Sequence, residues 1–368
     1  YNLGAEFSFN TSGDGEETSV TLSGLSENME ASIQLFEKLL QGPIASQEAL
    51  NKLVGRIIKS RSDAKKNKNI ILRNQLYAYG KYGEVNPASN NLNTKDLEDL
   101  RVEDLTDLIK NLSNYSHRIL YYGKMNQNSL SHMVKTYHKI PESFSEIINI
   151  ENYKEKIYDQ EYIFWTHFDM VQTEIILLSK LELLDNAKTA AIRLFNQYFG
   201  AGMNSIVFQE IREAQGLAYS VYSTFSQANK PDRSDYLYSY IGIQSDKQSE
   251  ALSSMFSLIN NLPESQQAFD ISKKAILNKI ESERITKSSV LYSYLNSEKR
   301  GINFDIREQV YNEVKAMDLE KLLKFHKTYI KDKPHNILLI GNRDKIDFKN
   351  LKKYGIIKEV SLDELFGF

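Results

Sequence analysis

The sequence predicts an α+β fold made of two homologous domains in tandem, each an antiparallel sheet with helices packed on one face. Three observations lead to this prediction. Segments that alternate apolar and polar residues, as strands do, are followed by segments with the apolar periodicity of helices. The same order of segments occurs twice. The length of 368 residues and the 41% share of hydrophobic residues are enough for two domains, each with its own core.

The first domain, residues 1–150, is predicted to open with a β-hairpin. Residues 6–11 and 18–23 alternate apolar and polar side chains, and a polar turn that contains glycine separates them. Helices are expected at 29–40 and, after Pro43, at 50–58, because apolar residues recur there at helical spacing. A helix at 97–112 and a closing strand at 119–122 complete the expected domain.

The second domain, residues 151–368, repeats this order. An offset of 220 residues pairs Pro43 with Pro263, and an offset of 218 pairs His117 with His335, so the register is kept over several elements. Only the second copy has a pair of strands and a helix ahead of its hairpin, so we expect the first domain to lack its opening strand and helix. The elements expected in the second domain are strands at 162–168, 174–179, 218–222 and 236–243 and a helix at 186–199.

Composition excludes several classes of function. With 46 Lys+Arg against 48 Asp+Glu, the chain has no general basic character that would bind nucleic acid. The absence of cysteine excludes disulfides, thiolate catalysis and metal sites with cysteine ligands. No run of 18 apolar residues occurs, so no membrane span is expected. The chain begins at Tyr1 with neither a starting Met nor a signal peptide, and we expect it to be a piece of a longer protein.

The most distinctive segment is 198–221, predicted to form a helix, a glycine turn, a second helix and a strand. Gly200 and Gly202 are expected to allow a positive φ or a close backbone approach, and Asn204 or Ser205 to cap the second helix. Gly216 is expected to end that helix. The residue types alone do not assign a function to this segment. Gly-x-Gly before a helix is weak evidence for a phosphate site, and an arginine on a helix is usually solvated or paired with a carboxylate.

The order of residues in this segment closely resembles the C-terminal-domain signature of the pitrilysin/insulinase family of zinc metallopeptidases, the inverzincins. The motifs are Phe-Gly-x-Gly-Met-x-Ser at 199–205, Phe-Gln-Glu-Ile-Arg-Glu at 208–213 and Gly-Leu-Ala-Tyr-Ser-Val at 216–221. The resemblance implies one half of a clamshell of paired α+β domains. It also implies that Arg212 and Tyr219 are catalytic, and that a substrate-binding loop is formed by Gly200, Ala201, Gly202, Met203 and Asn204.

The zinc site of that family is missing from this sequence. Its His-x-x-Glu-His motif does not occur, and Gly55-Arg56 stands where the resemblance places a further carboxylate ligand. His132 and His138 are close in sequence, but their spacing places them on different faces of a helix. Structural or surface roles are expected for all six histidines, namely His117, His132, His138, His167, His326 and His335. We therefore expect no metal on this chain and zinc in a homologous partner half.

The resemblance implies a half-enzyme that supplies Arg212 and Tyr219 to a facing half for endoproteolysis of peptides or unfolded segments. That zinc-bearing half would be part of the same longer chain or a separate subunit, and this chain alone would be close to inactive as a peptidase. The alternatives are a non-catalytic scaffold and a peptide-binding subunit of the same fold. Frequent Lys, Asn, Tyr and Ile residues are typical of AT-rich bacterial genomes, where such peptidases often act in the periplasm or cell envelope.

Overall fold

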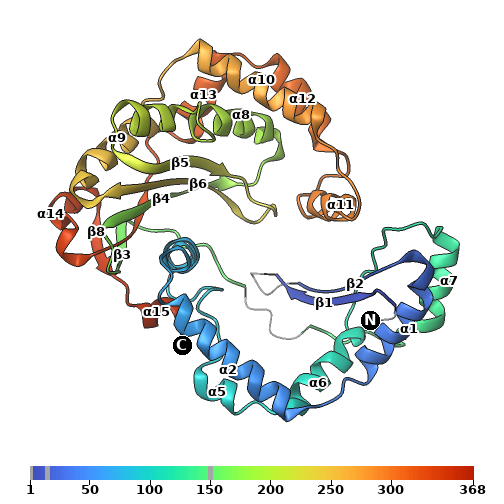
Figure 1. Cartoon of the computed structure of the whole chain (residues 1–368). Helices are drawn as coiled ribbons and strands as arrows, with labels where there is room; N and C mark the ends of the chain where they lie inside the picture. Colours follow the sequence, from blue (N-terminus) through green and yellow to red (C-terminus); the bar gives the residue numbers. More distant parts are fainter. Residues whose placement is uncertain (1–2, 13–16, 148–151) are drawn as a thin grey trace. The chain divides into compact units, whose positions relative to one another are not determined.

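The computed structural model describes residues 3–12, 17–147 and 152–368 (Figure 1). The chain forms two compact units. The first comprises Tyr1–Ala64, Asn90–Tyr153 and Gly367–Phe368, and the second comprises Lys65–Ser89 and Lys154–Phe366. The domain limits 1–150 and 151–368 concern the sequence repeat and remain a prediction. In space, the segment 65–89 packs with the second unit.

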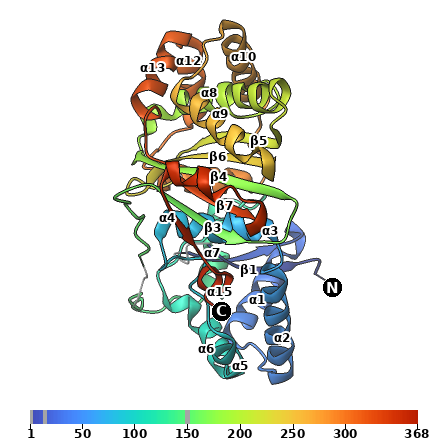
Figure 2. The same cartoon turned by 90° about the vertical axis from the view of Figure 1, so that its left-hand side faces the viewer.

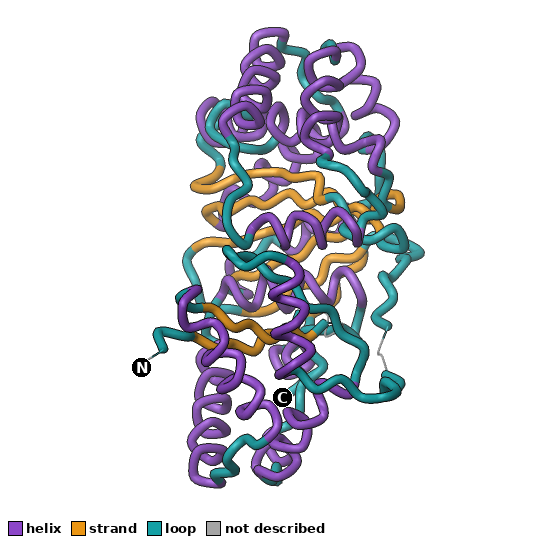
Figure 3. The backbone as a smooth tube through the Cα atoms, turned by 90° about the vertical axis from the view of Figure 1, so that its right-hand side faces the viewer, coloured by secondary structure: helices purple, strands orange, loops and turns teal. Residues whose placement is uncertain are grey.

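The first unit is built on one antiparallel hairpin of β1 (Glu6–Thr11) and β2 (Thr18–Ser23). Helix α1 (Met29–Gln41) packs against it, with the rings of Phe7 and Phe36 stacked at 5.6 Å between centroids. Figure 3 shows this hairpin as orange strands near the N-terminus. The other helices of the unit are α2 (Gln47–Ala64), α5 (Thr94–Glu98), α6 (Val102–Asn111) and α7 (Gln127–Tyr137).

The closing strand expected at 119–122 is wrong, since these residues have no strand structure and Ile119, Leu120 and Tyr122 are exposed or half-buried. A strand is stable only when a neighbouring strand accepts its backbone hydrogen bonds. In the described part of the first unit, β1 and β2 pair with each other. The segment 119–122 therefore has an apolar, strand-like sequence but pairs with no strand among the residues described.

The second unit contains a six-stranded sheet in the order β5-β6-β4-β7-β3-β8. Antiparallel pairing joins β5 to β6, β6 to β4 and β4 to β7, whereas β3 lies parallel to both β7 and β8. The α+β class is confirmed, and this sheet is mixed rather than purely antiparallel. The strands are β3 (Tyr162–His167), β4 (Gln172–Leu183), β5 (Ala218–Ser226), β6 (Ser234–Gln244), β7 (Asn336–Gly341) and β8 (Ile356–Glu359).

One face of this sheet is covered by helices, as Figure 1 shows for α8, α9, α10, α12 and α13. Their apolar side chains form one core with the inward residues of the strands, including Phe195 of α8 and Leu237 and Ile241 of β6. The helices are α8 (Thr189–Phe199), α9 (Gln248–Asn260), α10 (Gln266–Ser282), α11 (Ser289–Lys299), α12 (Ile306–Ala316), α13 (Leu319–Tyr329) and α14 (Phe348–Leu351).

The segment 68–82 packs against this sheet as well, as α3 (Lys68–Ile70), a π-helix η2 (Ile71–Leu76) and α4 (Tyr77–Tyr82). Figure 2 shows α3 and α4 beside strands β3 and β7. Ile71, Leu72 and Leu76 are fully buried. At Gly80 an added Cβ would lie 2.6 Å from a terminal methyl group of Leu338 of β7, so a larger residue here would require that side chain to shift.

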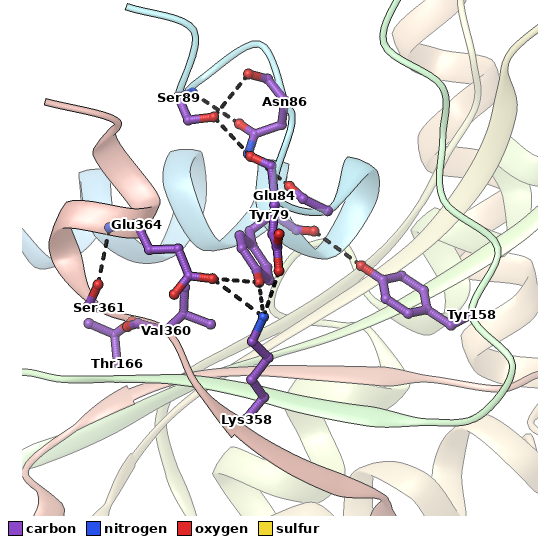
Figure 4. Close-up of polar contacts among 11 residues, drawn as sticks. Tyr79, Glu84, Asn86, Ser89, Tyr158, Thr166, Lys358, Val360, Ser361 and Glu364 are labelled. Carbon is purple, nitrogen blue, oxygen red and sulfur yellow. Dashed lines mark hydrogen bonds and ion pairs between the residues drawn. The ribbon is translucent and has the colours of Figure 1, made fainter. Parts of the chain in front are cut away.

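A charged cluster around Lys358 of β8 holds this segment in place (Figure 4). The Lys358 ammonium donates to the Tyr79 hydroxyl at 2.5 Å and to Glu84 at 3.0 Å. It also reaches Glu364 of α15 (Leu362–Phe366) at 3.4 Å. Burial raises the pKa of Tyr79 to about 12, and the hydrogen bond to Tyr79 raises the pKa of Lys358. Lys358 is therefore the cation that joins three acceptors from two segments far apart in sequence.

The two units share an order of elements. A short 3₁₀ turn at Ser26–Asn28 leads into α1, and another at Ser245–Lys247 leads into α9, an offset of 219 residues. The same offset relates the beginning of α2 at Gln47 to the beginning of α10 at Gln266. Within the described ranges, no helix combines the length and apolar character needed to cross a bilayer.

Candidate functional site

The loop after α8 depends on two glycines, and each has one of the roles expected for it. An added Cβ at Gly200 would lie 2.0 Å from the carbonyl oxygen of Ser223 on β5, so the two backbones touch there. The Ser223 N–H donates to the Gly200 carbonyl at 3.2 Å. Gly202 has a φ of +85°, which favours glycine. The loop is thus attached to the middle of β5, the edge strand that carries Tyr219.

The helix after this loop is mainly a π-helix, η5 (Phe208–Ala214), rather than the regular helix expected. Single-turn π segments are frequent at functional sites because they shift side chains around the helix axis. The expected side-chain cap is wrong, since the Ser205 hydroxyl instead donates to the Gly202 carbonyl at 2.8 Å. Gly216, with a φ of +61°, ends the helix as expected.

Arg212 lies on the solvent side of η5, with 45% of its side chain exposed. Its guanidinium lies 4.8 Å from the centre of the Phe208 ring. Its Nε is 3.8 Å from a carboxylate oxygen of Glu213, which is longer than a hydrogen bond. An exposed ion pair of this kind restrains an arginine little.

Tyr219 is the extra residue of a β-bulge at the beginning of β5. Ala218 pairs with Ile243, and Ser220 pairs with Gly242, so Tyr219 has no residue opposite it on β6. A bulge of this kind changes the direction of a side chain. Tyr219 is 53% exposed, whereas its neighbour Ala218 is buried. The Tyr219 hydroxyl accepts a hydrogen bond of 2.5 Å from the side-chain amide of Gln244.

Tyr219 lines a groove of about 660 Å³ at one end of the six-stranded sheet. Lys68 of α3 also lines it and donates to Glu174, which is 3% exposed, at 2.5 Å. The wall thus offers hydrogen-bond donors from hydroxyl, amide and ammonium groups, together with acceptors that include the Asp246 carboxylate. Arg212 and the loop 200–204 are not part of this wall. The lining residues are Lys68, Met170, Val171, Gln172, Tyr219, Gln244, Ser245, Asp246 and Lys345.

The residues that the structure describes do not fit a zinc ion. Among the described residues, no three His, Asp or Glu side chains are grouped so that they could hold a metal. On α2, Gly55 and Arg56 line a smaller hollow of about 510 Å³ together with Lys52 and Lys59. Cations cannot serve as zinc ligands, which are thiolates, imidazoles and carboxylates.

The structure brings together two histidines that sequence reasoning treated as separate. Nε2 of His117 and Nε2 of His138 lie 2.8 Å apart. Nδ1 of His138 lies 2.8 Å from the carboxylate of Glu37 on α1, and Nδ1 of His117 lies 2.7 Å from the Tyr115 carbonyl. The sequence held no signal for this pair, because the residues belong to separate turns. Their contacts tie the end of α7 to α1, which is a structural role.

Comparison with known proteins supports one family. The family described as Peptidase M16 inactive domain matches residues 100–276. The "Non-peptidase homolog YmxG" of Helicobacter pylori is 21% identical over 359 residues, which cover 92% of this chain and 78% of that protein.

Solved structures agree on the fold. A peptidase M16 inactive domain from Pseudomonas fluorescens superposes with a TM-score of 0.68 at 16% identity, covering 93% of this chain and 81% of that one. The periplasmic protease PqqL from Escherichia coli has a TM-score of 0.67 at 12% identity, and the match covers 93% of this chain but 38% of PqqL. The resemblance to the pitrilysin/insulinase (peptidase M16) family is therefore confirmed, and it is a resemblance to the inactive, non-zinc domain of that family.

Proposed function

We propose that this chain is the substrate-positioning half of a two-part peptidase. It receives an unfolded peptide and presents Tyr219 and Arg212 to a facing M16 half that holds the zinc. The observation that carries the proposal is Tyr219 itself, because a bulge displaces it from the strand ladder and its side chain lines a groove that Lys68 and Gln244 also line. A tyrosine with only a packing role would not need this exposure.

Tyr219 would donate its phenol proton to the carbonyl oxygen of the scissile peptide bond. That oxygen gains negative charge as the carbonyl carbon becomes tetrahedral. A donor already in place for this charge costs no reorganisation during the reaction. Removing one such donor typically costs about 10²–10³ in rate, or about 3–4 kcal/mol.

Arg212 would hold a main-chain carbonyl of the same peptide away from the scissile bond. Its weak contact with Glu213 leaves the guanidinium able to meet a new acceptor. The planar fork gives orientation as well as charge, and correct orientation is a large part of catalysis. The loop of Gly200, Ala201, Gly202, Met203 and Asn204 would line the peptide path, and Met203 is 73% exposed.

The partner would be an M16 half that carries His-x-x-Glu-His. The family match to the inactive domain supports such a pairing, since an inactive half lacks the residues that activate water. The chain spans 38% of PqqL, which supports an arrangement of two halves of similar size. The proposal holds whether the zinc-bearing half is in the same polypeptide or is a separate subunit.

The test is cleavage of an unstructured fluorogenic peptide by this chain combined with a zinc-bearing M16 half. Neither half alone should cleave it. Tyr219→Phe should lower kcat about 10²–10³-fold without changing the unfolding transition. Tyr292→Phe, an exposed tyrosine on α11, is the matched control and should keep full activity. Unchanged turnover in Tyr219→Phe would remove the proposed role.

A second candidate function is a non-catalytic scaffold or peptide-binding subunit of the same fold. The observation that favours it is the Helicobacter pylori relative, which is named a non-peptidase homologue. This alternative predicts that the combined halves bind the peptide, measured by fluorescence anisotropy, yet leave it intact. Binding should then be insensitive to Tyr219→Phe.

A further inference from the structure

We infer that Gln244 is a positioning residue for Tyr219, an inference that rests on the function proposed above. The Gln244 side-chain amide donates to the Tyr219 oxygen at 2.5 Å. Within the described part of the chain, Gln244 is the one hydrogen-bond partner of this hydroxyl. The contact restrains the phenol, and Tyr219 and Gln244 both line the groove.

Two features of the sheet place Gln244 within reach of Tyr219, namely the bulge in β5 and the end of β6. The bulge removes Tyr219 from the regular ladder, and its neighbour Ala218 then pairs with Ile243. Gln244 is the last residue of β6 and is paired through its backbone with Gln172 of β4. Its side chain therefore extends from a fixed strand end toward the displaced tyrosine.

The hydrogen-bond inventory of the two groups decides what this contact does. A phenol has one proton to donate and lone pairs that accept. Because the amide N–H of Gln244 donates to a lone pair, the phenol proton stays available for a substrate oxygen. A carboxylate at position 244 would accept that proton instead, since an ionised carboxylate can only accept. Gln244→Glu thus keeps the shape of the side chain and reverses the direction of the hydrogen bond.

The experiment uses the combined peptidase described above, with Gln244→Glu, Gln244→Leu and Tyr219→Phe. Gln244→Glu should lower kcat about tenfold or more, with KM within about twofold, because the donor is lost but binding surface is kept. Gln244→Leu should lower kcat less, since the phenol keeps its proton and loses only its restraint. In the Tyr219→Phe background, Gln244→Glu should cause no further loss. Gln266→Glu, an exposed exchange on α10, is the control for added charge.

The outcomes separate the inference from the function on which it rests. If Tyr219→Phe lowers kcat while Gln244→Glu matches the wild type, or if the two losses multiply, the positioning role is wrong and the proposed function stands. A greater loss in Gln244→Leu than in Gln244→Glu would mean that the amide oxygen accepts the phenol proton, which also overturns the inference. No loss in Tyr219→Phe would overturn both. Unfolding followed by Trp165 fluorescence checks that each variant keeps the fold.

Discussion

Replacing His335 should make the second unit less sensitive to acid. His335 precedes β7, is 4% exposed and packs its ring edge-on against Phe256 at 5.5 Å between centroids. Its Nε2 atom has no hydrogen-bond partner among the described residues. Burial lowers the pKa of His335 from 6.5 to about 4, because the charged ring cannot be solvated there. The folded state therefore keeps His335 neutral over a pH range in which the unfolded chain binds a proton.

The sign of the effect follows from proton uptake. Below pH 6.5 the unfolded state gains a proton that the folded state does not, so stability falls as pH falls until about pH 4. At about 1.36 kcal/mol per pKa unit, the full loss is about 3.4 kcal/mol. Between pH 7.5 and pH 5 the same calculation gives about 2 kcal/mol. This is a large fraction of the stability of an ordinary domain.

The assay is urea unfolding at both pH values, followed by the fluorescence of Trp165. This residue is the single tryptophan of the chain and is buried in β3 of the second unit. His335→Leu should lose about 2 kcal/mol less than the wild type between pH 7.5 and pH 5. His326, whose pKa is also lowered by burial, contributes equally to both proteins and cancels. His132→Gln, at an exposed position, is the control. Equal losses in wild type and His335→Leu would refute the reasoning.

Three further predictions concern the fold and the metal. Lys358→Met should lower the free energy of unfolding of the second unit by about 1 kcal/mol, a value that is reduced because Lys358 is partly exposed. The variant should also be cleaved faster by a protease within residues 77–89, as mass spectrometry of the fragments would show. Unchanged cleavage would contradict the role of the Lys358 cluster. Gly200→Ala should lower the free energy of unfolding by about 1–3 kcal/mol, because the added Cβ would overlap the Ser223 carbonyl oxygen. The control is Gly55→Ala, at an exposed position, which should not destabilise the protein. Equal melting temperatures of Gly200→Ala and the wild type would refute this contact. The isolated chain should bind no stoichiometric zinc, which plasma mass spectrometry after dialysis measures; one tightly held zinc per chain would contradict the assignment of a non-zinc half.

Sequence reasoning succeeded where the determining interactions are local. The helices at 29–41 and 189–199 and the paired strands at 6–11 and 18–23 follow from periodicities of a few residues, because these show which side of an element is apolar. The positive φ of Gly202 and Gly216 follows from the same short range, since only glycine adopts it without steric cost. The family resemblance, too, was carried by one continuous segment.

Sequence reasoning failed where the structure of a segment depends on a partner that is distant in sequence. Residues 119–122 have a strand-like sequence, but a strand needs a neighbour, and none is present in the described part of the first unit. The segment 65–89 packs with the second unit because its apolar side chains cover a sheet formed about a hundred residues later. The pair of His117 and His138 likewise depends on two turns that meet only in the folded state.

The sequence by itself determined the fold class and the resemblance to the M16 family, and it is the source of the proposal that Arg212 and Tyr219 act on a peptide. Only the tertiary structure decided how those residues are presented. The one-residue bulge that turns Tyr219 outward depends on its register with β6, and the hydrogen bond from Gln244 depends on where that strand ends. Register and strand ends are set by pairing between segments distant in sequence, so no local pattern could have shown them.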